Sequence, residues 1–271
     1  MPPTSSIIGH KELRHPNFHR EKALEWAKEY GPAYRLKMYL RDVVVLNDFE
    51  SIKKFSAHDE ILHRPDIMNF GLDYNKERHL VGNIKMFIIG GIDGPSVSMQ
   101  LCLVIFAARP TEIQRRIQRE IDAVIRQGKL PTWDERKRMP FTLACVWELE
   151  RWKRTEPFGL PRGTGADMVV DNFFVPKGSV VLFNLWKVNR DPSLWKNPHH
   201  FDPGRFLQED GSLIPEKPSY HVGFSFGQAA LGETGRAASS TQPAHCSPVR
   251  GRLDIVSFNF QPRGLTPGWE N

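Results

Sequence analysis

Few residues of this chain could do chemistry, and they form charged pairs rather than metal clusters. Glu148 and Arg151 lie three positions apart, so on a helix they share one face and can form an ion pair. The pair alone is weak evidence, because a surface ion pair on any charged helix gives the same pattern. The three cysteines, Cys102, Cys145 and Cys246, lie far apart and form no CxxC motif. We therefore expect neither a disulfide framework nor a zinc site.

Composition narrows the class of protein further. The chain has 271 residues and a formal charge of +6, with Lys and Arg scattered along it, and its hydrophobic share of 40% is enough for a core. Basic and aromatic residues are not interleaved, so we expect no nucleic-acid partner. The longest uninterrupted apolar run, residues 101–108, is too short to span a bilayer. Taken alone, the chain is therefore predicted to be soluble and cytoplasmic.

Helices and strands must position the charged pair. Apolar spacing predicts helices over 20–30, 111–127 and 140–153, and the last of these carries Glu148 and Arg151. Alternation predicts strands over 33–41, 43–46 and two extended runs within 166–186. The segment 84–108 is mostly apolar, but two glycine-containing pairs, Gly90-Gly91 and Gly94-Pro95, are expected to break or kink any helix there.

Several short motifs follow one another in a fixed order. They are EWAKEYGPAYRL, VVVLNDFESIKK, HRPD, GGIDGPS, ELER, LPRGT, VPKGSVV, RDPSLWKNPHHFDPGRF, FSFG and LGET. In this order they resemble the cytochrome P450 family of haem-thiolate monooxygenases, of the microsomal type, over residues 1–78 and 84–236. The resemblance implies a mixed α+β fold that is mainly helical with small β-sheets. It also implies one domain with three parts, which are an N-terminal sheet-and-helix segment (1–78), an oxygen-groove to haem-loop region (84–236) and an atypical tail (237–271).

The resemblance implies a role for three charged residues. Glu148 and Arg151 match the family's ExxR pair, and Arg205 in FDPGRF matches the arginine that joins it. The triad would be buried and structural, and it would position the haem loop. A charge left unpaired there would be costly.

Other residues are implied to contact the cofactor. Arg162 matches the arginine that reaches a haem propionate, where a planar guanidinium suits a carboxylate. Phe224 and Gly227 would begin the haem loop, and Gly232 would lie at its end. Asp93 would help to relay protons to iron-bound oxygen.

The chain departs from the family at the iron ligand. The family loop reads FxxGxRxCxGE, whereas here Gly227 is followed by QAAL, and LGET matches the segment just after the family's cysteine. One residue is missing before Leu231, and neither cysteine nor arginine remains. The thiolate that would push electron density onto the iron is therefore absent from its expected position.

No other residue is a good substitute for that ligand. Cys246 lies in a patternless tail, and Cys102 and Cys145 lie on predicted helices as small hydrophobic residues. Ligation by His221 is conceivable but would give different iron chemistry.

Two further departures affect the pocket. The family's oxygen-groove threonine falls at Gly94, with Pro95 after it, so the proton relay would be impaired. The eight residues ERHLVGNI replace the long run of helices that separates HRPD from the oxygen groove in the family. We therefore expect a truncated or internally deleted member with an incomplete core.

By resemblance, the chain is an oxidoreductase (EC 1.14 class) that inserts one oxygen atom of O₂ into a small organic substrate. It would use haem, with electrons from NADPH through a cytochrome reductase or cytochrome b5, at the endoplasmic reticulum membrane. The missing cysteine predicts that this chain is inactive. Two alternatives are a non-catalytic fragment that binds the reductase or a full-length relative, and an unfolded remnant with no function.

Overall fold

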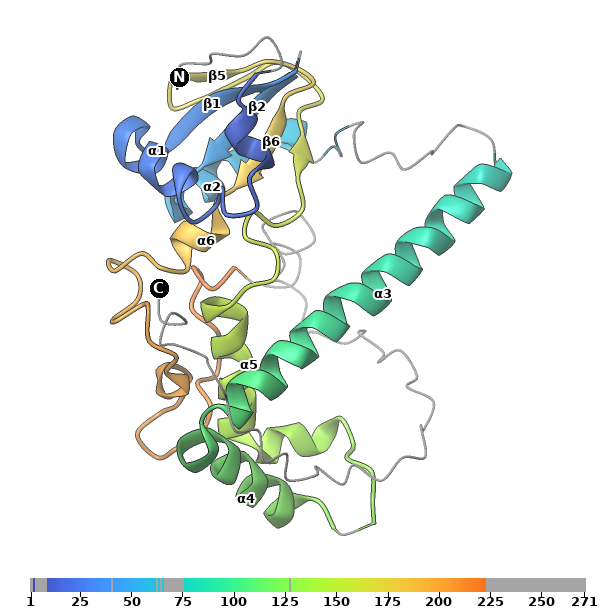
Figure 1. Ribbon diagram of the computed structural model, residues 1–271, viewed down its shortest axis with the longest axis vertical. Coiled ribbons are helices and arrows are strands. Elements are labelled where there is room, and N and C mark those ends of the chain that lie inside the picture. Colours follow the sequence, from blue (N-terminus) through green and yellow to red (C-terminus); the bar gives the residue numbers. More distant parts are fainter. Residues whose placement is uncertain are drawn as a thin grey trace.

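The computed structural model describes residues 2, 9–39, 41–61, 63, 65, 76–126 and 128–222. Figure 1 shows a β-sheet region with small helices at one end, a group of helices at the other, and one long helix running between them. The helices, with the short η turns, are η1 (Lys11–Arg14), α1 (Lys22–Tyr30), α2 (Phe49–Ser56), η2 (Asp59–Ile61), α3 (Lys76–Ala107), η4 (Pro110–Gln114), α4 (Arg115–Val124), η5 (Asp134–Arg138), α5 (Pro140–Trp152), α6 (Leu185–Val188) and η6 (Pro203–Phe206).

The strands form one mixed sheet and one hairpin. The sheet has the order β1-β2-β6-β3, in which β2 pairs parallel to β6 and the other neighbours are antiparallel. Strands β4 and β5 form a separate antiparallel pair. The strand bounds are β1 (Ala33–Met38), β2 (Arg41–Leu46), β3 (Arg162–Gly163), β4 (Met168–Val170), β5 (Phe173–Val175) and β6 (Val180–Phe183). The predicted mixed α+β class with small sheets is confirmed.

Local sequence explains the first elements. Helix α1 ends at Gly31, whose φ of +82° is a backbone conformation that favours glycine. In β1, Tyr34 and Leu36 are buried and their neighbours are half-buried, as the alternation predicts. Helix α2 begins after Asp48, whose carboxylate accepts a hydrogen bond from the Ser51 amide at 2.7 Å.

The apolar core lies in separate layers around the sheet and around α5. Val44 and Leu46 of β2 belong to the cluster on one face of the sheet, and Val43 and Val45 belong to the cluster on the other. Strand β2 is central, so burial on both faces explains its continuous valine run. A third cluster joins α4 to α5 through Ile113, Ile117, Phe141 and Cys145.

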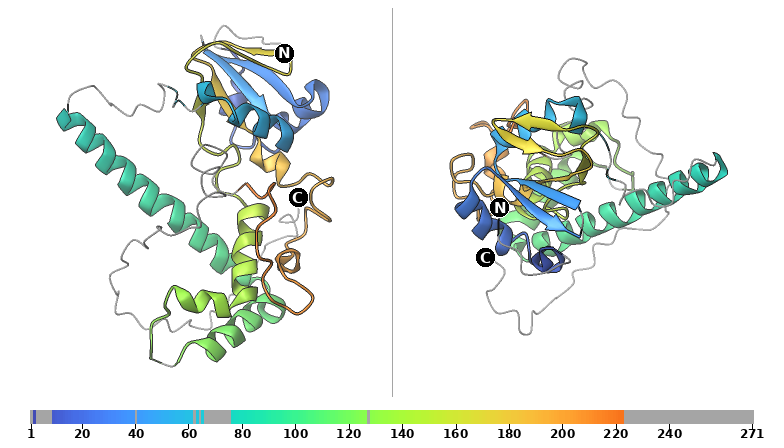
Figure 2. Two further views of the ribbon diagram at one scale, coloured as in Figure 1. Left: turned by 180° about the vertical axis from the view of Figure 1, so that it is seen from behind. Right: turned by 90° about the horizontal axis from the view of Figure 1, so that it is seen from above.

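Helix α3 is continuous, so the prediction of a break or kink at its glycines and proline was wrong. Pro95 lies inside the helix and removes one intrahelical hydrogen bond there. Apolar residues on both sides extend the helical segment past these positions. Figures 1 and 2 show α3 projecting from the rest of the molecule, with its first residues farthest out.

The surface of α3 is unusually apolar for an exposed helix. Four large side chains, Ile88, Ile92, Met99 and Leu103, are each more than half exposed. A helix that is apolar on all sides is normally covered by protein or lipid. The exposure fits a fold that lacks the helices expected between HRPD and the oxygen groove.

The same helix corrects the expectation that no segment could span a bilayer. The window Gly90–Ala107 has a mean hydropathy of 1.3, and 6% of it is buried. By length and composition it could cross a membrane, although a core helix of a soluble protein passes the same test. The run of residues 101–108 is too short alone, but the continuous helix joins it to the glycine-rich segment.

Candidate functional site

Helix α5 presents Glu148 and Arg151 to the interior of the protein. Both side chains are fully buried, which excludes the surface ion pair that the sequence left open. Arg151 Nε donates to Glu148 Oε2 and Nη2 donates to Glu148 Oε1, both at 2.7 Å. Two parallel hydrogen bonds between a planar guanidinium and a carboxylate are the strongest form of such a pair.

The remaining donors of Arg151 bind backbone carbonyls of the segment 189–200. Nη1 donates to Asn189 O at 2.7 Å and to Pro198 O at 2.8 Å, and Nη2 donates to His200 O at 3.1 Å. All five N–H donors of the guanidinium therefore have acceptors. A segment without regular secondary structure is held against α5 through its own carbonyl groups.

Arg205, in η6, is the third member of the cluster. Its Nε donates to Glu148 Oε1 at 3.3 Å, and its Nη2 donates to Asn197 O at 2.8 Å. A further bond joins its Nη1 to the carbonyl of Lys196. The structure therefore brings together the three residues that the ExxR resemblance selected.

Sequence reasoning missed two other members of this network. The backbone amide of Asp202 donates to Glu148 Oε1 at 2.8 Å, so the carboxylate accepts bonds from three separate groups. The ring of Trp195 is 3% exposed and lies 5.2 Å from the Arg151 guanidinium carbon. Only the aromatic content of residues 186–220 could have indicated Trp195, and no sequence signal marks a backbone amide.

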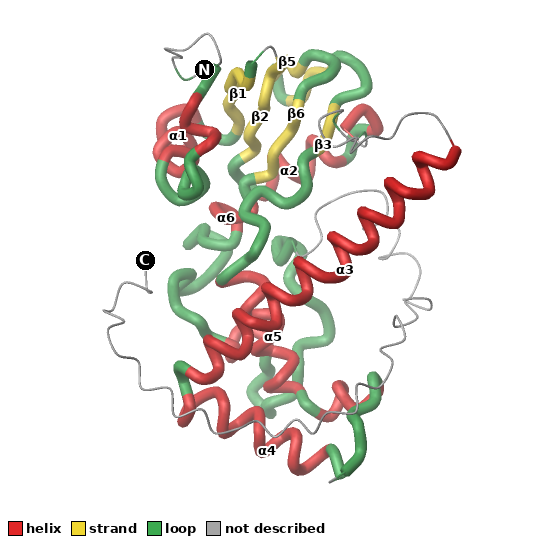
Figure 3. The backbone as a smooth tube through the Cα atoms, turned by 45° about the vertical axis from the view of Figure 1, so that its right-hand side comes forward, coloured by secondary structure: helices red, strands yellow, loops and turns green. Residues whose placement is uncertain are grey.

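Arg162 lies on β3, in the sheet region rather than in the network. It pairs with Val181 of β6, and its side chain is half-buried. Figure 3 shows β3 within the sheet region, apart from the α5 end of the molecule. Its contact with a haem propionate remains a prediction.

Asp93 lies on the exposed part of α3. The neighbouring residues Ile92 and Gly94 are also exposed, so the structure places Asp93 in solvent rather than in an enclosed groove. Its predicted role in proton relay therefore has no surrounding site among the described residues.

The cofactor loop follows the part of the chain that the structure describes. Phe224, Gly227 and Gly232 lie outside the described residues, as do Cys246 and the tail 237–271. The described part ends at Val222, just before the loop.

The described cysteines do not fit a haem-thiolate ligand. Cys145 is fully buried on α5 among Ile113, Ile117 and Phe141, and burial raises the pKa of its thiol to about 12. Cys102 is half-buried on α3, and burial followed by the charge of Glu150 raises its pKa. Both side chains are therefore neutral thiols at physiological pH, whereas iron binds the thiolate.

His221 is also unsuited to bind iron. Its Nε2 lies 3.0 Å from the carbonyl of Trp147, and its ring packs against the rings of Trp195 and Phe206. Burial lowers the pKa of His221, so the ring is neutral. Its Nδ1 is enclosed and has no hydrogen-bond partner in the described structure. Neither the described cysteines nor His221 is therefore suited to bind a haem iron.

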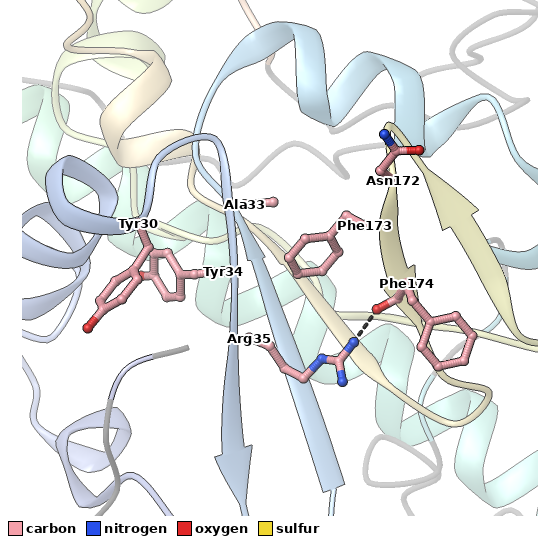
Figure 4. Close-up of a pocket in the computed structure, with 7 residues that line it drawn as sticks. All are labelled: Tyr30, Ala33, Tyr34, Arg35, Asn172, Phe173 and Phe174. Atoms are coloured by element: carbon pink, nitrogen blue, oxygen red, sulfur yellow. Dashed lines mark hydrogen bonds between the residues drawn. The ribbon is translucent and has the colours of Figure 1, made fainter.

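A pocket of about 280 Å³ lies elsewhere, between α1, β1 and β5. Its lining includes Tyr30, Tyr34 and Phe173 (Figure 4). The Arg35 guanidinium donates to the carbonyl of Phe174 and lies 5.9 Å from the Phe173 ring. These contacts join the sheet to the β4–β5 hairpin, and the pocket includes no residue of the network.

Comparisons with known proteins agree with the motif order. A sequence model described as "Cytochrome P450" matches residues 74–230. The chain is 34% identical over 219 residues to "Cytochrome P450 2U1" of Bos taurus, covering 75% of this chain and 39% of that protein. It is 29% identical to the Homo sapiens protein of the same name, with the same coverage. Over 141 residues it is 38% identical to "Cytochrome P450 monooxygenase claR" of Ampulloclitocybe clavipes, covering 52% of this chain and 26% of that protein. The chain thus spans about two fifths, or less, of the length of these relatives.

Proposed function

Because this chain belongs to the cytochrome P450 family, we propose that it is a member that keeps the structural half of the haem-binding machinery and lacks haem-thiolate catalysis. The observation that carries this proposal is the buried cluster of Glu148, Arg151 and Arg205, which fixes the segment that leads to the cofactor loop. In the family that loop supplies the iron ligand.

The described residues support the absence of thiolate chemistry. Haem in this family performs monooxygenation when a cysteine thiolate binds its iron. Here the loop sequence has no cysteine between Gly227 and Leu231, and Cys102 and Cys145 are thiols committed to packing. These residues therefore do not fit a haem-thiolate centre.

The ExxR cluster has a structural task that does not require the cofactor. The ExxR cluster neutralises a buried carboxylate and connects α5 to residues 189–205 through carbonyl acceptors. In an intact member, the same connection would orient the loop that follows Val222. Arg162 would bind a propionate, and Asp93 would move protons once the groove were enclosed. The redox partner would be a NADPH-dependent reductase or cytochrome b5, at the endoplasmic reticulum membrane, with a small organic molecule as substrate.

The proposal is tested with the full chain, added haem, NADPH and a cytochrome P450 reductase. We expect NADPH consumption to equal that of the reductase alone. A relative whose loop contains the cysteine serves as the positive control. Haem-dependent NADPH consumption above the reductase background, together with an oxygenated product, would overturn the proposal.

A further inference from the structure

Three basic side chains, Arg190, Arg20 and His19, contact the ring of Trp186 in α6. The Arg190 guanidinium carbon lies 3.2 Å from the centre of this ring, and the Arg20 guanidinium carbon lies 4.9 Å from it. The imidazole of His19 meets the same ring edge-on at 4.9 Å. Lys153 lies beside this group, because Arg190 donates a hydrogen bond to the carbonyl of Trp152, the residue that directly precedes Lys153. Three segments far apart in the sequence thus bring their charges to one place.

Arg20 and Arg190 are close together because they share one ring. Their guanidinium carbons can be separated by no more than the sum of their two distances to Trp186. Arg20 is exposed, and its Nε donates to His19 Nε2 at 3.2 Å. His19 therefore accepts with a neutral ring nitrogen and positions Arg20. Arg190 donates to the carbonyl of Trp152 at 2.5 Å and, weakly, to the carbonyl of Trp186 at 3.5 Å, which leaves donors free.

The charge of this cluster is not balanced by the part of the chain that the structure describes. None of its four side chains forms an ion pair with a carboxylate there. The pKa of Lys153 is lowered by burial and then by Arg20 and Arg190. Burial, Arg151 and Arg20 lower the pKa of Arg190 to about 9. Lys153 and Arg190 are therefore repelled by neighbouring cations, and a bound anion would offset that repulsion.

We propose that Arg20, Lys153 and Arg190 form a binding site for a phosphate-class oxyanion. A phosphate group carries more than one negative charge and presents several oxygens, so it can contact two guanidinium groups and an ammonium at once. Arg20 is exposed and can reach a ligand from solvent, whereas Trp186 is only 5% exposed. It contains no residue of the ExxR cluster and does not depend on haem.

The phosphate group could belong to a soluble molecule or to a lipid headgroup, and one set of proteins tests both. Isothermal titration of the full chain with inorganic phosphate, against chloride at the same ionic strength, should show saturable binding with one site per chain. Arg20→Gln and Lys153→Gln should each weaken that binding about tenfold, as expected for the loss of one charge-assisted contact. Lys129→Gln removes the same charge from an exposed position away from the cluster and should leave binding unchanged.

Sedimentation with vesicles identifies the source. A lipid headgroup is the ligand if the chain binds phosphatidylcholine vesicles that contain phosphatidic acid but does not bind vesicles of phosphatidylcholine alone. In that case Arg20→Gln should weaken the binding to the vesicles. Binding of phosphate without binding of vesicles assigns a soluble ligand. The proposal is overturned if neither probe binds saturably, or if Lys129→Gln weakens binding as much as the two cluster variants. Circular dichroism of each variant establishes that it is folded, and Arg20, being exposed, is the substitution least able to disturb packing.

Discussion

Replacing Glu148 with glutamine should destabilise the protein severely, because the carboxylate is the only negative partner that Arg151 contacts among the described residues. The side chain accepts two hydrogen bonds from Arg151, one from the Asp202 amide and one from Arg205. Glutamine keeps the shape but removes the charge, and its NH₂ group would face N–H donors. Arg151 would then be a fully buried cation without compensation.

The magnitude follows from that burial. Removing one partner of a buried ion pair costs about 3–5 kcal/mol, against a total stability of about 5–15 kcal/mol for typical domains. We expect Glu148→Gln to lower the free energy of unfolding by that amount, measured by urea denaturation at neutral pH and followed by far-ultraviolet circular dichroism. The variant would consequently be partly unfolded even without denaturant if the parent lies at the low end of that range.

Glu150→Gln is the matched control, two positions along the same helix. Glu150 pairs with Lys217 at 2.8 Å, but both side chains are about one third exposed. The same chemical change should cost less than about 1 kcal/mol there. Equal losses for the two variants, or a loss below about 1 kcal/mol for Glu148→Gln, would refute the assignment of Glu148 as the centre of a buried network.

Three further predictions concern other parts of the structure. Cys145 should resist iodoacetamide at neutral pH until urea unfolds the chain, because burial raises its pKa to about 12; mass spectrometry that finds it modified in the native protein would contradict its burial. Burial and Arg20 lower the pKa of His19 from its ordinary value of 6.5 to about 4 in the folded protein. As the pH decreases, the unfolded chain therefore binds a proton at this histidine before the folded protein does. The free energy of unfolding should consequently decrease as the pH is lowered from about 6.5 to about 4. His19→Gln should reduce this loss of stability in acid-denaturation curves. A curve identical to that of the parent protein would argue against the lowered pKa of His19. Finally, Met99→Lys with Leu103→Lys should increase the monomer fraction in size-exclusion chromatography, since both side chains are more than 60% exposed apolar groups; a lower monomer fraction would show that these residues are covered.

Several elements could be predicted because their sequences carry local signals. The alternation in residues 33–38, the aspartate before α2 and the isoleucine stripe of α4 all correspond to observed elements. The α4 stripe begins one turn earlier than the regular helix, since residues 110–114 form a π-helical turn. Strand order could not be predicted, because pairing of β2 with β6 joins residues more than a hundred positions apart.

Helix α3 shows where local signals mislead. Glycine and proline lower helix propensity at five positions of α3, yet each acts over about one turn, and the apolar residues around them favour a continuous helix. Propensity is a weak prior that surrounding sequence overrides. The solvent exposure of α3, in contrast, depends on which partner helices are present, and the sequence of α3 does not carry that information.

The site was only partly accessible from sequence. Spacing placed Glu148 and Arg151 on one helical face, but their burial depends on carbonyl groups of residues 189–200, whose sequence gives no such signal. The cation cluster at Trp186 was missed for the same reason, because its members are distant in the chain and unremarkable individually.

The carbon monoxide difference spectrum of the reduced, haem-supplemented protein tests most directly whether this P450-family chain lacks a thiolate ligand. We expect no thiolate-type Soret band, so the spectrum should show either no band or a band typical of histidine ligation. A thiolate-type band would contradict the account. If that band were lost in Cys246→Ser but kept in Cys145→Ser, it would identify a cysteine of the tail as the iron ligand.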